Sequence, residues 1–93
     1  MIVGVLIIDL YVDGCNSLKG KRQIIKSLKT RIQNNFNISI TELGDRDLWQ
    51  RSKLGVTCGA NDRASIDAIL NKVIEFIQKE KAVSIIDAET EVR

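Results

Sequence analysis

The chain has 93 residues, of which 44% are hydrophobic and 28% charged, and its formal net charge is +2. These values are typical of one small globular domain spanning residues 1–93, and they exclude a disordered chain. There is no histidine, so the commonest general base and metal ligand are both missing. Two cysteines far apart in the sequence make no zinc site, and we expect no metal and no cofactor.

The first predicted element is a strand over residues 3–12, since this segment is apolar at odd and even positions until Asp9. Continuous apolarity is typical of a central strand covered on both faces. The sequence Asp13-Gly14 ends the strand. A helix follows from Ser17 to about Asn35, with Ser17 as its N-cap and an apolar arc on one side.

The rest of the chain predicts a half-buried alternating strand over residues 37–43, a turn over 44–47 and a further strand over 49–60. A second helix begins at Asn61 or Asp62, and a last strand covers residues 83–92. Gly55 and Gly59 in the second of these strands predict a bulge or the close approach of another backbone.

The order strand-helix-strand-strand-helix-strand predicts an α+β, ferredoxin-like fold. In this fold two split β-α-β units form a four-stranded antiparallel sheet of order 4-1-3-2, with both helices on one face. The other face is left without helices. The first strand has two aliphatic rows, one on each face of the sheet. Either the row of Val3, Val5 and Ile7 or the opposite row therefore lies on this open face. A bare aliphatic patch is typical of an interaction site, so this face predicts a homodimer or a small-ligand site.

Positive charge gathers on the first helix. No acidic residue lies between Asp13 and Glu42, and the helix stripe formed by four cations is suited to contact RNA phosphates: Lys19, Arg22, Lys26 and Lys29. The alternative is a solvated helix face whose lysines cover the edge of the core.

Two further residues are candidates for specific contacts. Lys21 falls inside the apolar arc of the helix, where it either contacts Asp9, Glu89 or a ligand, or extends past the core to solvent. Trp49, the single tryptophan, is either an exposed interface or base-stacking residue or a cap on the core.

Catalysis is the least favoured function. It would depend on Asp9, Asp87 or Glu89 with Lys21, in a pocket that joins them. The loop after the first strand, residues 13–16, has no arginine, which argues against the phosphate chemistry of acylphosphatases, proteins with this same layout.

No segment reaches the roughly 18 apolar residues of a membrane span, and no signal peptide is evident before Asp9. Cys15 and Cys58 are expected to be reduced thiols, with a single disulfide as the less favoured state. The lack of a membrane span and signal peptide, together with the reduced thiols, predicts a cytoplasmic protein without membrane contact.

Five segments, in this order and spacing, resemble the YlxP family of small bacterial proteins: Ser-Leu-Lys-Gly-Lys-Arg (17–22), Asn-Ile-Ser-Ile-Thr-Glu (37–42), Asp-Leu-Trp-Gln (47–50), Leu-Gly (54–55) and Asn-Asp (61–62). The resemblance implies a ferredoxin-like fold, bacterial cytoplasm and a role near the ribosome, and it offers no catalytic residues to carry over. Gly20 departs from the family pattern, in which an acidic residue is common. We therefore expect a non-enzymatic domain whose partner is RNA or a ribosomal particle.

Overall fold

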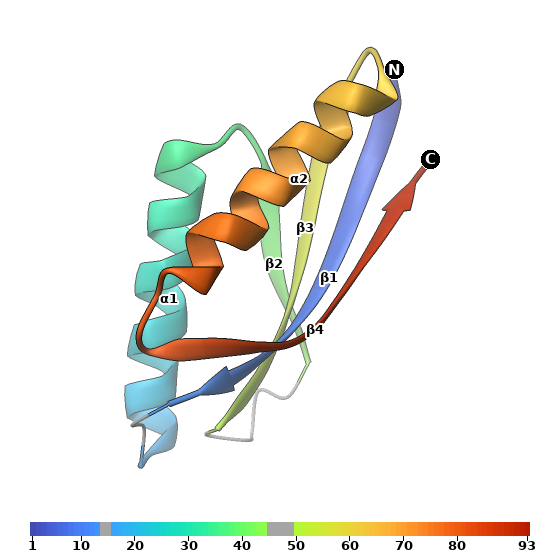
Figure 1. Cartoon of the computed structure of the whole chain (residues 1–93). Coiled ribbons are helices and arrows are strands. Elements are labelled where there is room, and N and C mark those ends of the chain that lie inside the picture. Colours follow the sequence, from blue (N-terminus) through green and yellow to red (C-terminus); the bar gives the residue numbers. More distant parts are fainter. Residues whose placement is uncertain (14–15, 45–49) are drawn as a thin grey trace.

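The structure is a computed structural model that describes residues 1–13, 16–44 and 50–93. Its six elements follow the predicted order (Figure 1): β1 (Ile2–Val12), α1 (Leu18–Asn35), β2 (Ser39–Gly44), β3 (Arg51–Ala60), α2 (Arg63–Gln78) and β4 (Val83–Val92). The sheet has the strand order β2-β3-β1-β4, and all its pairings are antiparallel. This is the predicted order 4-1-3-2, and the ferredoxin-like fold is therefore confirmed.

β1 lies in the middle of the sheet and divides its side chains between two faces. Leu6, Ile8 and Leu10 are fully buried and face the helices. They form one cluster with the buried aliphatic side chains of both helices, which are Ile25, Leu28 and Ile32 of α1 and Ile66, Leu70, Val73 and Ile77 of α2. Both helices therefore cover the same face, as Figure 1 shows. Each fully buried aliphatic side chain contributes about 1.5–3 kcal/mol to stability.

Both helices begin at a polar cap. The Ser17 side chain accepts a hydrogen bond of 3.0 Å from the Gly20 N–H, and the Asp62 carboxylate accepts one of 2.8 Å from the Ser65 N–H. Such caps satisfy N–H groups that have no partner inside the helix. The predicted cap of α1 is confirmed, and Asp62 is the cap of α2.

The glycines of β3 differ from the prediction. The register of β3 against β1 is continuous through Gly55 and Gly59, so neither marks a bulge. The irregularities lie instead in β2, between Glu42 and Gly44, and where β4 pairs with β1 next to Asp9. What approaches Gly55 is the Leu43 side chain, whose Cδ1 would lie 2.9 Å from an added Cβ. Gly55 thus makes room for a side chain and not for a second backbone.

Candidate functional site

The clearest collection of charged side chains lies in a groove between α1 and β2. Arg22, Lys26 and Lys29 are spaced i, i+4 and i+7, so they share one side of α1. Together with Ile25 and with Glu42 of β2 they line a hollow of about 270 Å³. Three of the four predicted helix cations therefore converge on one hollow, which we call the α1–β2 groove.

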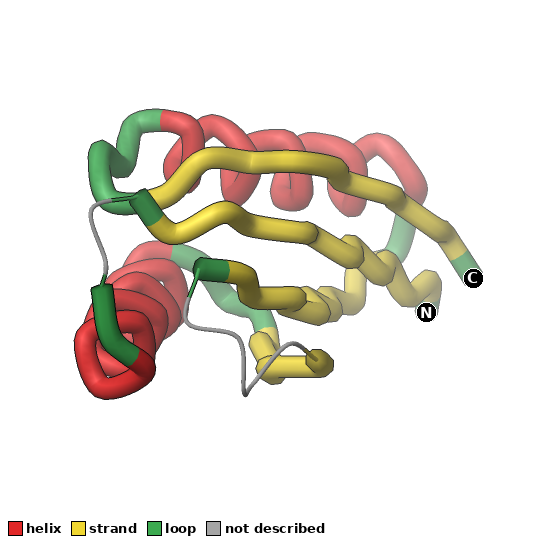
Figure 2. The backbone as a smooth tube through the Cα atoms, turned by 90° about the horizontal axis from the view of Figure 1, so that it is seen from below, coloured by secondary structure: helices red, strands yellow, loops and turns green. Residues whose placement is uncertain are grey.

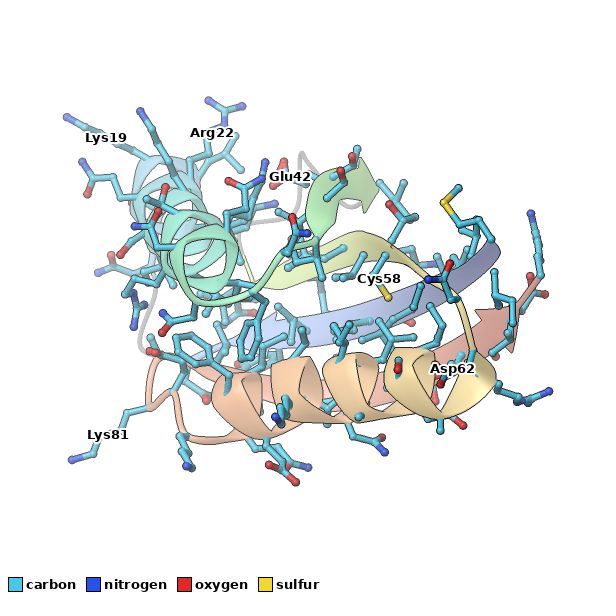
Figure 3. All side chains as sticks on the ribbon, turned by 90° about the horizontal axis from the view of Figure 1, so that it is seen from above. Lys19, Arg22, Glu42, Cys58, Asp62 and Lys81 are labelled. Atoms are coloured by element: carbon cyan, nitrogen blue, oxygen red, sulfur yellow. The ribbon has the colours of Figure 1, made fainter. Side chains whose placement is uncertain are left out.

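Lys19 lies one turn before Arg22 and does not line the hollow. Its side chain is exposed, and Figure 3 shows Lys19 and Arg22 projecting outward from the same end of α1. The fourth predicted cation therefore extends the basic surface beyond the α1–β2 groove.

The cations of α1 have no acidic partner within the helix itself. The helix has no acidic residue in its sequence, and neighbouring like charges such as Arg22 and Lys26 cost a few tenths of a kcal/mol for each pair. Arg31 at its far end is paired with Glu80, beyond α2. Arg22, Lys26 and Lys29 line the α1–β2 groove together with the carboxylate of Glu42, so a bound anion would further reduce their mutual repulsion.

Glu42 is the residue of the groove that sequence reasoning missed. The alternation of β2 places it on the same side as the buried Ile40, toward the helices. Because β2 lies at the edge of the sheet, this position opens onto the flank of α1. The predicted alternation contained this signal, but the pairing of α1 with β2 that makes it meaningful is tertiary. The groove thus combines three cations with one carboxylate.

Lys21 is separate from the other cations. Its side chain is 0% exposed, and its Nζ donates a hydrogen bond of 3.1 Å to the backbone carbonyl of Arg51 in β3. The predicted inward orientation is correct, and the alternative in which the side chain extends past the core to solvent is wrong. A fully buried amine is also not available for direct contact with RNA. Of the partners considered from the sequence, Asp9 and Glu89 are not reached, because both lie on the opposite face of the sheet.

The face of the sheet without helices carries the row of Val3, Val5 and Ile7. These side chains are half-buried, and their register partners on β3 are Gly59, Thr57 and Gly55. Leu43, whose side chain lies against Gly55 on this face, is 50% exposed. Of the two aliphatic rows, this one is therefore open. Trp49, the other predicted interface residue, lies outside the described residues.

The carboxylates proposed for catalysis are not joined to Lys21. Asp9 stands opposite Asp87 in the pairing of β1 with β4, and Glu89 stands opposite Ile7. Lys53 Nζ lies 3.8 Å from Asp9 Oδ1. All of these groups are on the open face, and the sheet separates them from Lys21. Within residues 1–13, 16–44 and 50–93, no group of three or more metal-ligating side chains is found.

Cys58 is a free thiol in β3 and is 6% exposed. Burial raises the pKa of the Cys58 thiol above its ordinary value, and a backbone hydrogen bond with Gly4 partly offsets the rise. Cys15 lies outside the described residues. No helix in the described part of the chain is long and apolar enough to span a membrane.

The element order, strand order and single layer of helices define a ferredoxin-like α+β domain. Solved structures of this class are similar in fold. SnoaB, a cofactor-independent oxygenase from Streptomyces nogalater, superposes with a TM-score of 0.55 at 12% identity, over 98% of this chain and 90% of that one. The designed protein LFR1 1, with a ferredoxin fold, gives 0.51 at 17% identity, over 100% and 85% of the two chains. At these identities the likeness is one of fold alone.

Within this class the chain belongs to the family described as "Protein of unknown function (DUF503)", whose family model matches residues 3–90. It is also 38% identical to the uncharacterized protein YlxP of Bacillus subtilis (strain 168) over 69 residues. These residues make up 74% of this chain and 75% of the relative. The resemblance to the YlxP family is therefore confirmed.

Proposed function

We propose that this chain is a non-catalytic cytoplasmic domain that binds RNA, free or within a ribosomal particle, through the α1–β2 groove. The observation that carries the proposal is the convergence of Arg22, Lys26 and Lys29 on one hollow. From Arg22 to Lys29 the helix rises by about 10 Å. One strand of a nucleic-acid duplex presents about three phosphates over that length.

The side chains suit this role in different ways. Arg22 offers a planar guanidinium, which binds phosphate oxygens in pairs, and the two lysines act as point charges. Glu42 accepts hydrogen bonds, and RNA supplies donors in the ribose 2′-hydroxyl and in exposed base amino groups. The groove therefore favours a ligand with alternating phosphates and donors over a simple inorganic anion.

The test is the salt dependence of RNA binding. Fluorescence anisotropy would follow a labelled RNA hairpin between about 50 and 200 mM salt. We expect the triple variant Arg22→Ala, Lys26→Ala, Lys29→Ala to bind more weakly and to lower the slope of log K against log salt by about 2–3. A matched control removes three cations from α2 and its C-cap instead: Arg63→Ala, Lys72→Ala and Lys79→Ala.

Equal losses in the two triple variants would show that general charge, and not the α1–β2 groove, attracts RNA. Affinity that does not respond to salt would overturn the proposal. A parallel experiment asks whether the wild-type chain sediments with purified ribosomal subunits and whether the α1 triple variant remains in the supernatant.

A second function is favoured by the open face of the sheet. The half-buried row of Val3, Val5 and Ile7 has small partners on β3, so a second copy of the chain is able to approach closely. Four strands of 6 to 11 residues offer roughly 500–600 Å² per copy, which is near the lower limit of specific interfaces. We therefore infer that any homodimer formed here is weak.

Sedimentation equilibrium at millimolar concentration tests this second function. Wild-type chain should dimerise, and Val5→Glu should remain monomeric with its fold intact. Thr57 is exposed on the face of the sheet without helices and stands opposite Val5 in the register. Thr57→Glu should therefore weaken the dimer in the same way, whereas Glu75→Gln on α2 should not. A wild-type monomer at that concentration would remove the dimer from consideration.

A further inference from the structure

The outer edge of β4 is exposed over six consecutive residues, 86–91. β4 ends one side of the sheet, and in the described part of the chain its sheet partner is β1. Figure 2 shows β4, which leads to the C-terminus, as the outermost strand beside β1. The strand therefore offers a free edge, and free edges of this length readily pair with another extended chain.

The hydrogen bonds to β1 identify the backbone groups that face outward. Val3 and Arg93 exchange two hydrogen bonds, of 2.8 and 2.7 Å. In an antiparallel ladder, bonded and non-bonded pairs alternate. Glu91 and Glu89 therefore bond to β1, whereas Ala88 and Thr90 turn their N–H and C=O groups away from the sheet. The side chains of Ala88 and Thr90 are small, which leaves the edge accessible.

The side chains along this edge are acidic on the open face. Asp87, Glu89 and Glu91 alternate there, and Arg93 pairs with Glu91 at 2.6 Å. Asp87 stands directly opposite Asp9, and like charges in opposite positions destabilise a sheet. Lys53 lies 3.8 Å from Asp9 on the β3 side, whereas Asp87 is at the edge of the sheet. A cation supplied from outside β4 would lie next to Asp87 and reduce this repulsion.

The same charges disfavour pairing with a second β4. Two copies joined edge to edge would bring one acidic row against another, at a cost for each opposed pair. The backbone groups of this edge are therefore available for pairing, and its acidic side chains select against another acidic strand.

We propose that the outer edge of β4 binds an extended basic segment of a partner protein by strand addition, with lysine or arginine at alternate positions beside Asp87 and Glu89. Main-chain hydrogen bonds to Ala88 and Thr90 hold the added strand, and the alternate cations give selectivity. This surface lies at the opposite edge of the sheet from β2 and the α1–β2 groove, so the proposal is independent of RNA binding.

The test uses the peptide acetyl-Thr-Lys-Val-Lys-Val-Lys-Thr-amide with the full chain, and it reads binding by NMR titration and amide hydrogen exchange. We expect slower exchange of the Ala88 and Thr90 amides on binding. Asp87→Lys with Glu89→Lys should weaken binding by about tenfold, because two attractive cross-strand pairs become repulsive.

A backbone variant separates strand addition from simple attraction of charge. Thr90→Pro removes an outward N–H and retains all acidic side chains, and an edge strand tolerates proline at such a position. We expect Thr90→Pro to keep its sheet, as judged by circular dichroism, and to lose the peptide. A control peptide with the same composition and three adjacent lysines should bind several-fold more weakly, since adjacent residues of a strand face opposite sides.

The proposal is overturned if the peptide binds Thr90→Pro as well as wild-type chain, or if the two peptides bind equally. It is also overturned if the peptide leaves the exchange of the Ala88 and Thr90 amides unchanged. The triple variant of α1 should bind the peptide normally, which distinguishes this proposal from that of the α1–β2 groove.

Discussion

Lys21 places its amine at a fully buried position. Its Nζ donates to the Arg51 carbonyl, so an apolar replacement leaves that carbonyl without this donor. We expect Lys21→Met, which keeps the length of the side chain, to lower the free energy of unfolding by about 1–3 kcal/mol. Urea denaturation would measure it. The control Lys26→Met lies on an exposed position of the same helix and should change stability by less than about 0.5 kcal/mol.

Cys58 gives stability a pH dependence of known sign. Burial raises its pKa in the folded chain, so the unfolded thiol, near its ordinary value of about 8.5, loses its proton first as the pH rises. The stabilisation that the buried, protonated thiol gives is therefore complete below the pKa of the unfolded thiol, and it is lost as the pH rises through the pKa of the folded thiol. We expect urea denaturation in a Cys15→Ser background to show a steeper loss of stability above about pH 8.5 than in the same background with Cys58→Ala. Parallel curves would contradict the buried thiol.

For single residues, the sequence predicted which way a side chain points better than it predicted which group that side chain contacts. The helical phase of Lys21 correctly turned it toward the core. Its acceptor, however, lies 30 positions away, and only the docking of α1 on β3 selects it. The grouping of Glu42 with Arg22 has the same origin. Side chains whose partner is on another element are therefore beyond the reach of periodicity alone.

At the scale of elements, the packing of α2 on β1 depends on the absence of a side chain at Gly4. An added Cβ would overlap Ile66 Cγ2 and lie 3.1 Å from Leu70 Cδ1, both on α2. We expect Gly4→Ala to lower the free energy of unfolding by about 1–3 kcal/mol, because the helix must move away from the strand.

The control for this prediction is Gly59→Ala in β3. There the added Cβ would meet the Met1 sulfur at 3.2 Å, and a methionine side chain moves aside easily. Gly59→Ala should therefore be near neutral, or stabilising by up to about 1 kcal/mol through the unfolded state. Thermal unfolding of both variants would decide, and a smaller loss for Gly4→Ala than for Gly59→Ala would show that α2 adapts freely.

The elements themselves were predicted closely, since their signals are local. The last strand was predicted over residues 83–92 as observed, and Ser17 caps α1 as expected. β2 begins two residues later than predicted and β3 also two later. The role of Gly55 was not predicted, because the Leu43 side chain reaches it across the β2–β3 pairing.

At the scale of the whole molecule, element order was sufficient for the topology but not for the choice of open face. Both rows of β1 begin with aliphatic residues. The rows differ at their ends, where Leu10 and Val12 continue the buried row and Asp9 and Tyr11 continue the open one. That difference is a signal in the sequence, and it would have assigned Val3, Val5 and Ile7 to the open face.

The antiparallel pairing of the first and last strands brings the two ends of this chain together. Val3 and Arg93 are hydrogen-bonded to each other, and both ends lie at the same side of the sheet (Figures 1 and 2). A linker of about three to five residues is therefore long enough to join Arg93 to Met1. Because cyclisation restricts the unfolded chain more than the folded one, we expect it to raise the free energy of unfolding by about 2–4 kcal/mol.

The control for cyclisation is a linear chain that carries the same linker at its C-terminus, so that composition is equal and only the closure differs. Urea denaturation would compare the two. Equal stability would mean that the ends separate before the rest of the sheet unfolds. In that case the pairing of β1 with β4 near Val3 contributes little to the cooperative unit, and hydrogen exchange at Val3 and Arg93 should then be fast even under strongly native conditions.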